Sequence, residues 1–191
     1  MRAGGWLGVG LCSALLALGP ASQAQSRRRP APAPAPAGPK GPPCSSAPHR
    51  QFDFWVGEWE VTTPQGAPAG SNRVERLLEG CALQEHWAAS DGSKGTSLSS
   101  YDAVARKWRQ TFVDDTGQVL VLEGDFKDGR MVLQGEKVMG RQKGALQRIS
   151  WQVVNGEKVR QRWDISQDDG RTWSVLFEGI YTRKKAPTPG G

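Results

Sequence analysis

The chain has 191 residues, 25 of them Lys or Arg and 19 Asp or Glu, which gives a formal net charge of +6. Residues 1–50 contain no acid and carry the whole excess of positive charge: Arg2, Arg27, Arg28, Arg29, Lys40 and Arg50. From residue 51 onward, 19 bases balance 19 acids. A domain without net charge has no long-range field to attract polyanions, so we do not expect a nucleic-acid partner.

Residues 1–24 have the pattern of a secretory signal peptide. Arg2 supplies a positive start, WLGVGLCSALLALG is apolar, and Ser22, Gln23 and Ala24 place small residues near a signal-peptidase site. We expect cleavage near Ala24 and a secreted or periplasmic protein. A membrane anchor is the alternative, but the apolar stretch is interrupted by Gly and is shorter than the ~20 residues that span a bilayer. Stable membrane insertion is therefore not expected.

Residues 25–43, QSRRRPAPAPAPAGPKGPP, are a low-complexity Pro/Ala segment with a basic start. This composition favours an extended, disordered linker that cannot form a core. Its cations could make a transient contact with anionic material of the cell envelope, or the segment is only a solvated spacer. Residues 186–191 are predicted to be a disordered tail.

Two cysteines remain after signal removal, and export would place them in an oxidising compartment. We therefore predict a disulfide between Cys44 and Cys81. These cysteines and the two histidines, His49 and His86, lack the spacing of a zinc site. Neither a metal nor a cofactor is predicted.

The segment 44–185 is predicted to be one domain of short extended runs, without a stretch of helical period. Turn sequences such as EG at 79–80, DG at 128–129 and NG at 155–156 separate the runs. Even spacing favours an all-β, antiparallel, up-and-down barrel, because closure removes the exposed strand edges. The ten predicted strands are 58–63, 70–78, 81–89, 94–102, 107–113, 118–126, 130–138, 145–154, 158–166 and 172–183.

The first testable hairpin has Glu79 and Gly80 as a two-residue turn. This register puts Val74 opposite Glu85 and Arg76 opposite Leu83. One inner face then holds the apolar residues Val74, Leu78, Leu83 and Trp87. The same face carries Arg76 and Glu85, which we expect to meet as diagonal neighbours, either as a structural pair or with Glu85 as a catalytic carboxylate.

Two further hairpins place indoles beside uncharged polar groups. A three-residue loop at 155–157, with Gly156 left-handed, aligns Trp151 with Gln161 and Ile149 with Trp163. The hairpin at 94–113 pairs Tyr101 with Trp108, Ser99 with Gln110 and Ser97 with Phe112. Ten strands enclose more space than eight, so these faces are expected to line a cavity unless large side chains fill it.

The predicted ligand-binding residues are the inward side chains of this mixed lining. They are Arg76, Glu85, Trp87, Ser99, Tyr101, Trp108, Gln110, Trp151, Gln161 and Trp163. The alternative is that the Trp residues are core and the polar ones face water at the mouth. A hollow of roughly 300 Å³ or more would indicate a container.

The segment FDFWVGEWEV at 52–61 opens the first strand. We expect its first aromatic residues to plug one barrel end and Gly57 to bend the chain before Trp59, the first inward side chain. The pattern G-x-W resembles the calycin superfamily, in which the Trp packs on the barrel floor. That resemblance implies a basic cover from the last strand, for which Arg183 is the candidate.

The chain also resembles a bacterial family of secreted, lipocalin-like proteins of unknown function. The resemblance spans about residues 44–183 and rests on FDFWVGEWEV, LEGCALQEHW, SLSSYDAVARKWRQTFVDDTG and DISQDDGRTW. It implies a fold and export, without an activity. Nitrobindins have a comparable barrel and opening but bind haem through a His in the final strand. The final strand here, WSVLFEGIYTRK, has none, and alternation directs His86 outward.

Three functions remain compatible with the sequence. The first is an exported protein that binds a small amphipathic or aromatic molecule. The second is a lyase or isomerase that uses Glu85 as acid or base with Arg76 tuning its pKa, although the sequence identifies no catalytic nucleophile. The third is a cell-envelope interaction module with a filled barrel. The ligand and the oligomeric state are not predicted.

Overall fold

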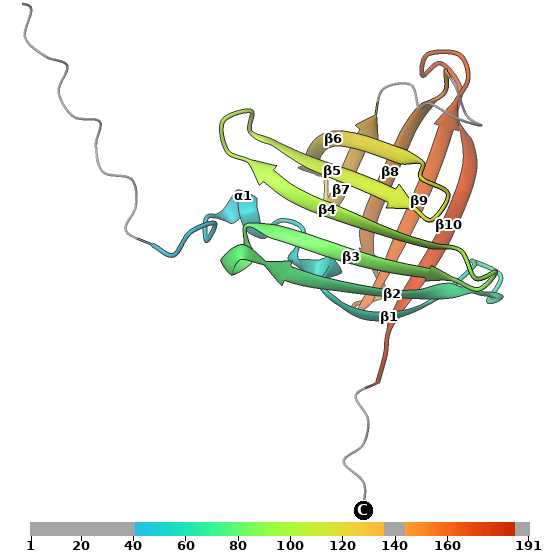
Figure 1. Ribbon diagram of the computed structural model, residues 1–191, viewed down its shortest axis with the longest axis horizontal. Helices are drawn as coiled ribbons and strands as arrows, with labels where there is room; N and C mark the ends of the chain where they lie inside the picture. The colour runs from blue at the N-terminus through green and yellow to red at the C-terminus, as the bar shows by residue number, and fades with distance from the viewer. Residues whose placement is uncertain (1–40, 136–143, 186–191) are drawn as a thin grey trace, which may run out of the picture. The chain divides into compact units, whose positions relative to one another are not determined.

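A computed structural model describes residues 41–135 and 144–185 of the chain. It is an all-β structure in which ten antiparallel strands form a closed up-and-down barrel (Figure 1). The strands are β1 (Gly57–Thr62), β2 (Pro68–Leu77), β3 (Ala82–Ala89), β4 (Lys94–Asp102), β5 (Lys107–Asp114), β6 (Val119–Lys127), β7 (Arg130–Gly135), β8 (Leu146–Val154), β9 (Lys158–Ser166) and β10 (Ser174–Arg183).

The predicted strands agree with the observed ones to within two residues at every end except one. Strand β7 is described as far as Gly135, and the predicted end at residue 138 lies outside the described residues. The predicted signal peptide, nearly all of the predicted linker and the predicted tail lie outside the described residues.

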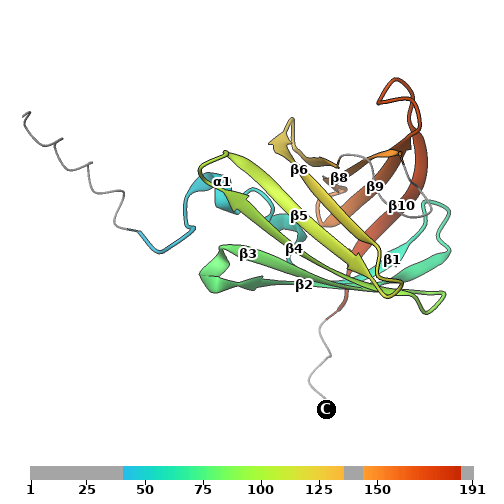
Figure 2. The same ribbon diagram turned by 45° about the horizontal axis from the view of Figure 1, so that its top comes forward.

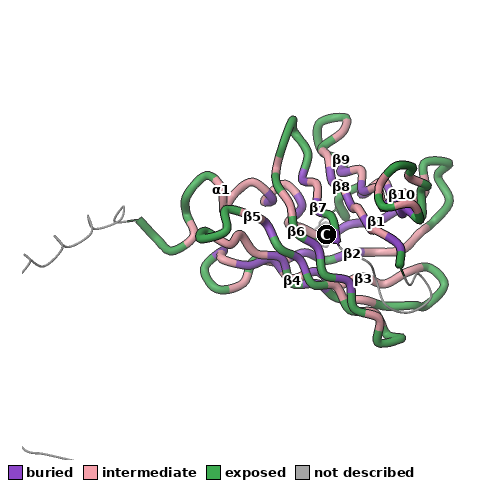
Figure 3. Tube along the Cα trace, turned by 90° about the horizontal axis from the view of Figure 1, so that it is seen from above, coloured by how far each residue is buried: buried purple, intermediate pink, exposed green. Residues whose placement is uncertain are grey.

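Each strand pairs with the next along the chain, and β1 pairs with β10 to close the barrel (Figure 2). Buried residues recur along the strands, whereas exposed residues dominate the connecting turns (Figure 3). The pattern follows from the pleat, which directs alternate side chains inward. The core therefore lies inside the barrel.

The three predicted registers are confirmed. Val74 lies opposite Glu85, Trp151 opposite Gln161, and Tyr101 opposite Trp108. The turn between β2 and β3 keeps the predicted register, with the Cys81 N–H bonded to the Leu78 carbonyl at 3.1 Å, but it has the form of a 3₁₀ turn, η2 (Leu78–Gly80). Leu78 has a φ of 51° there and is 75% exposed, so it leaves the inner face to which it was assigned.

The segment before β1 closes one end of the barrel, as predicted. It contains a short helix, α1 (Ala47–Arg50), and a 3₁₀ turn, η1 (Asp53–Trp55). The ring of Phe52 stacks on Trp55 with centroids 4.9 Å apart and meets the edges of Trp108 and Trp151 at 5.6 and 5.0 Å. We call Phe52 and Trp55 the aromatic plug; both are completely buried.

Gly57 and Trp59 have the geometry expected from the G-x-W pattern. The Arg183 guanidinium lies 4.3 Å from the centroid of the Trp59 ring and donates a hydrogen bond of 3.0 Å to the carbonyl of Val56. Gly57 has a φ of +145°, and a Cβ there would lie 2.2 Å from Arg183 Nη1. Glycine is therefore needed both for the backbone conformation and for the approach of Arg183.

The predicted disulfide between Cys44 and Cys81 is present. It joins the segment before α1 to the end of the η2 turn, 37 residues later in the chain. The aromatic plug lies within this loop, so the crosslink holds the plug to the β2–β3 hairpin.

Replacing both cysteines with serine should lower the free energy of unfolding by about 3 to 4 kcal/mol, because the open chain gains entropy when it unfolds. Urea unfolding of the two proteins, followed by Trp fluorescence, measures this difference. A reducing agent should shift the wild-type midpoint and leave that of the Cys44→Ser/Cys81→Ser variant unchanged. Equal midpoints for the two proteins without reductant would contradict the expectation.

Candidate ligand-binding cavity

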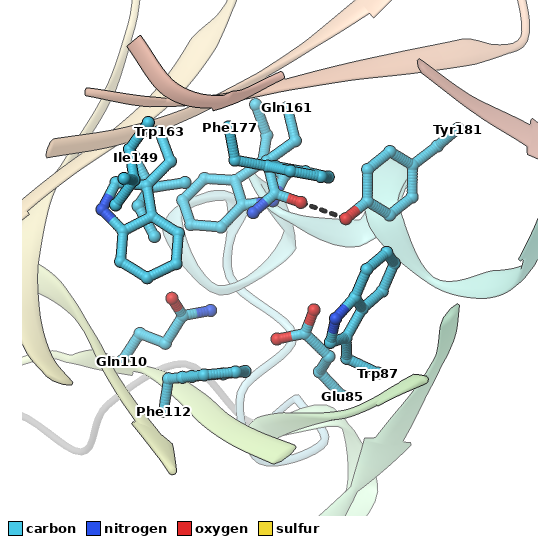
Figure 4. A pocket seen from close by; sticks show the side chains of 11 residues that line it. Glu85, Trp87, Gln110, Phe112, Ile149, Gln161, Trp163, Phe177 and Tyr181 are labelled. Atoms are coloured by element: carbon cyan, nitrogen blue, oxygen red, sulfur yellow. Dashed lines mark hydrogen bonds between the residues drawn. The ribbon is translucent and has the colours of Figure 1, made fainter. Parts of the chain in front are cut away.

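The interior of the barrel keeps a hollow of about 150 Å³ (Figure 4). Its lining combines aromatic side chains with a few polar groups from β3, β5, β8, β9 and β10. The lining residues are Glu85, Trp87, Gln110, Phe112, Ile149, Trp151, Gln161, Trp163, Leu176, Phe177 and Tyr181.

Three rings on the side of the cavity away from the plug are positioned by contact with each other or with a glycine. Trp87 and Phe177 meet edge to face with centroids 5.9 Å apart. Phe112 lies against Gly95 of the neighbouring strand, where a Cβ would be only 2.2 Å from its ring. A side chain at residue 95 would therefore push Phe112 out of its present position.

Glu85 is the centre of a buried hydrogen-bond network. Asn72 Nδ2 donates to its Oε1 at 2.9 Å, and Ser97 Oγ donates to its Oε2 at 2.7 Å. Gln110 Nε2 donates to Ser97 Oγ at 3.3 Å and to Ser99 Oγ at 3.0 Å. The five side chains come from β2, β3, β4 and β5, so the register of three hairpins fixes the carboxylate in the cavity.

The opposite wall carries a second polar group of side chains. Tyr181 donates its hydroxyl hydrogen to Gln161 Oε1, and Trp163 Nε1 donates to Gln147 Oε1 at 2.6 Å. Burial raises the pKa of Tyr181 well above its ordinary value, and the nearby Glu85 charge adds to this effect. Tyr181 is therefore a neutral hydroxyl at physiological pH. The indole N–H of Trp151 has no acceptor among the described residues.

Glu85 is the second group of the cavity with a shifted pKa. Burial raises its pKa from 4.5 to about 7, although the hydrogen bonds from Ser97 and Asn72 favour the charged form. No ion pair of Glu85 is present within the described part of the chain. A carboxyl with a pKa near neutrality can act as a proton donor, a proton acceptor or an anionic binding group.

Six of the ten predicted ligand-binding residues line the hollow: Glu85, Trp87, Gln110, Trp151, Gln161 and Trp163. Ser99 is completely buried one step behind the lining, where it accepts the hydrogen bond from Gln110. Trp108 and Tyr101 lie instead at the plugged end. Trp108 packs on Phe52 and donates to Gln51 Oε1 at 3.2 Å, and Tyr101 packs on Trp108 and His49.

The expected meeting of Arg76 with Glu85 is wrong. Arg76 is exposed at the plugged end, where its Nη2 lies 3.0 Å from Asp53 Oδ2 in η1. Strand register does not predict Asp53 as the partner of Arg76, because the segment before β1 is not a strand. Arg76 therefore has no direct effect on the Glu85 carboxyl.

Five lining residues were not among the predicted ones: Phe112, Ile149, Leu176, Phe177 and Tyr181. The predicted registers direct Phe112 and Ile149 inward, opposite Ser97 and Trp163, so the sequence pattern contains the signal for both. Tyr181 and Phe177 follow by alternation from Arg183, which covers Trp59. Leu176 breaks the alternation because the β9–β10 register shifts between Val175 and Phe177.

Neither histidine of the domain faces the cavity. His86 lies on the outer face, as predicted, with its Nε2 3.3 Å from Glu75 Oε1. His49 is in α1 and accepts or donates a hydrogen bond of 2.8 Å with Ser46 Oγ. Within residues 41–135 and 144–185, no group of three or more His, Cys, Asp or Glu side chains is placed to hold a metal ion.

Comparison with known proteins found no family model that matches the chain and no curated protein that matches it. The resemblance to secreted lipocalin-like proteins therefore rests on the four sequence segments and stays a prediction. No helix in the described part of the chain is long and apolar enough to cross a membrane.

The raised pKa of Glu85 predicts that the free energy of unfolding falls as the pH rises. The folded protein holds the Glu85 proton more tightly than the unfolded chain does, because the pKa is about 7 in the fold against an ordinary 4.5. The contribution of the protonated Glu85 to stability is therefore complete below pH 4.5, and it is lost as the pH rises through about 7. Over this range, Glu85 changes the free energy of unfolding by at most about 3 kcal/mol.

Urea unfolding of the wild type and of Glu85→Gln between pH 4.5 and 8.5 tests this sign. The stability of wild type minus that of the variant should fall across this range, because other groups titrate alike in both proteins. A difference that stays constant or rises with pH would contradict a raised pKa.

Proposed function

We propose that this chain is an exported binding protein whose barrel holds one small amphipathic or aromatic molecule. The observation that carries the proposal is the hollow, with six aromatic residues and the polar side chains of Glu85, Gln110 and Gln161 around it. Apolar walls with a few convergent polar groups are typical of small-molecule sites. The aromatic faces would provide stacking, and the polar groups would orient the ligand.

The volume restricts the size of the ligand. The hollow of about 150 Å³ is smaller than the roughly 300 to 1,000 Å³ of sites for drug-sized molecules. It does not reach the size first expected for a container, because the aromatic side chains occupy much of the interior. A dry cavity of about this size accepts benzene. The proposed ligand is therefore a molecule with about one ring or a short chain.

The compartment is part of the proposal. The disulfide between Cys44 and Cys81 is typical of proteins that mature in an oxidising compartment. Together with the signal-like sequence of residues 1–24, it supports a secreted or periplasmic location. Contact of the basic linker with the cell envelope remains a separate hypothesis.

A proton-transfer enzyme, such as a lyase or isomerase, is the second candidate. It is favoured by one observation, the pKa of about 7 of Glu85 inside a cavity, since general acids and bases work best when their pKa is near the working pH. Arg76 would have no part in it. A filled barrel that serves only as an envelope module is supported less, because a hollow remains.

A variant that fills the hollow should abolish binding. Ile149 lines the cavity and is 4% exposed, so Ile149→Trp would place an indole in the hollow. We expect wild-type protein to bind benzyl alcohol, a neutral one-ring probe, with millimolar affinity or better, and Ile149→Trp to bind it at least about tenfold more weakly. Calorimetric titration measures both affinities.

The matched control is Val121→Trp, which adds the same indole on the outside of β6, where Val121 is 61% exposed. It should bind as the wild type does. Native mass spectrometry of protein isolated from its own host should also show a bound small molecule. Absence of any bound molecule, together with no binding of the probe to wild type, would refute the proposed function.

A further inference from the structure

Glu85 is the one side chain with a formal charge among the described residues that line the hollow. Its carboxyl group points toward the middle of the cavity (Figure 4). Asn72 and Ser97 hold it in place through one hydrogen bond each, but neither carries a charge that would balance it. A buried carboxylate without a cation is unfavourable, so the cavity is one positive charge short whenever Glu85 is ionised.

Two oxygen atoms near Glu85 can still accept a hydrogen bond, whereas the indole N–H of Trp151 on the same lining is a donor without an acceptor among the described residues. Gln110 uses its Nε2 for Ser97 and Ser99, so its Oε1 remains free to accept. Asn72 is 3% exposed, and its Oδ1 finds no donor within the described part of the chain. An ammonium group has three donors and could bond to the Glu85 carboxylate and to such oxygen atoms together.

The remaining wall is aromatic. Six residues with rings surround the hollow: Trp87, Phe112, Trp151, Trp163, Phe177 and Tyr181. The face of an aromatic ring attracts a cation placed within about 6 Å of its centroid. The two cation–π contacts found among the described residues lie elsewhere, with Arg183 on Trp59 and Arg148 on Trp173. Among the described residues, no Lys or Arg side chain therefore makes a cation–π contact with the rings of the cavity.

We infer that the ligand of this cavity is a small organic cation, a monoamine whose ammonium group lies against Glu85 inside the aromatic wall. This inference rests on the proposed binding function and narrows its ligand class. Anionic molecules do not fit, because Glu85 would repel them and no Lys, Arg or His is among the residues described as lining the hollow. The volume of about 150 Å³ limits the amine to about one ring or a short chain.

The first experiment compares benzylamine with benzyl alcohol, which have the same ring and nearly the same shape but differ in charge. Calorimetric titrations at pH 8.5 should show benzylamine binding at least tenfold more tightly than benzyl alcohol. Glu85→Gln should lose this preference. Glu123→Gln removes a carboxylate from the exposed face of β6 and should keep the preference.

The second experiment uses wild type alone and remains informative if Glu85→Gln does not fold. The residues facing Glu85 from β2 and β4 are the uncharged Asn72, Val74 and Ser97. Tyr181 of β10 is the other titratable group of the lining, and its raised pKa keeps it neutral in this range. Since the Glu85 pKa is about 7, benzylamine should bind about 30-fold more weakly at pH 5.5 than at pH 8.5.

The outcomes separate the inference from the proposed function. If benzyl alcohol binds as tightly as benzylamine, or if the affinity for benzylamine does not change with pH, the cation inference is wrong and the binding function stands. If neither probe binds to wild type, the cation inference is wrong, and the binding function is wrong too if native mass spectrometry shows no bound molecule. A preference for benzylamine that disappears in Glu85→Gln, or that weakens with acid as stated, supports the inference.

Discussion

Strands β1 and β10 pair from Trp59 opposite Arg183 to Thr62 opposite Ile180, and this pairing closes the sheet. Closure gives each of the ten strands two neighbours and leaves the sheet without a free edge. It also fixes an interior that side chains must fill, because a closed barrel cannot collapse around a gap as an open sheet can. Large aromatic side chains are needed to fill this fixed interior, and the hollow remains where these side chains do not meet.

The filling is uneven along the barrel. At the end near α1, the aromatic plug of Phe52 and Trp55 packs on Trp108 and Trp151, and the disulfide ties its loop to the β2–β3 hairpin. Trp151 connects the plugged end with the cavity, since it contacts the plug and also lines the cavity. The plug therefore forms the floor of the cavity, and the polar groups of Glu85 and Gln110 lie above this floor, away from solvent.

Strand positions, three registers and the inward side of most Trp residues could be predicted because alternation and turn chemistry are local properties. The partner of Arg76 could not, because Asp53 reaches it only after the segment before β1 folds back across the barrel end. Leu78 was misplaced because three successive residues of its turn have positive φ, which alternation does not anticipate. The cavity volume depends on how the rings of Phe112, Phe177 and Trp87 pack, and this is a property of side-chain rotamers.

Glu85 is a buried carboxyl group without a base beside it, and packing alone does not account for it. The other buried carboxylate among the described residues, Asp164, has Arg148 and Arg162 beside it, each at 3.3 Å or less. Glu85 has only uncharged donors, Asn72 and Ser97. A glutamine at this position could bond to the same two side chains without burying a charge. Features that lower stability without a local gain are expected where a protein binds or reacts. The missing positive charge is therefore better explained by a ligand than by packing, and the aromatic wall around it offers a cation the most favourable surroundings.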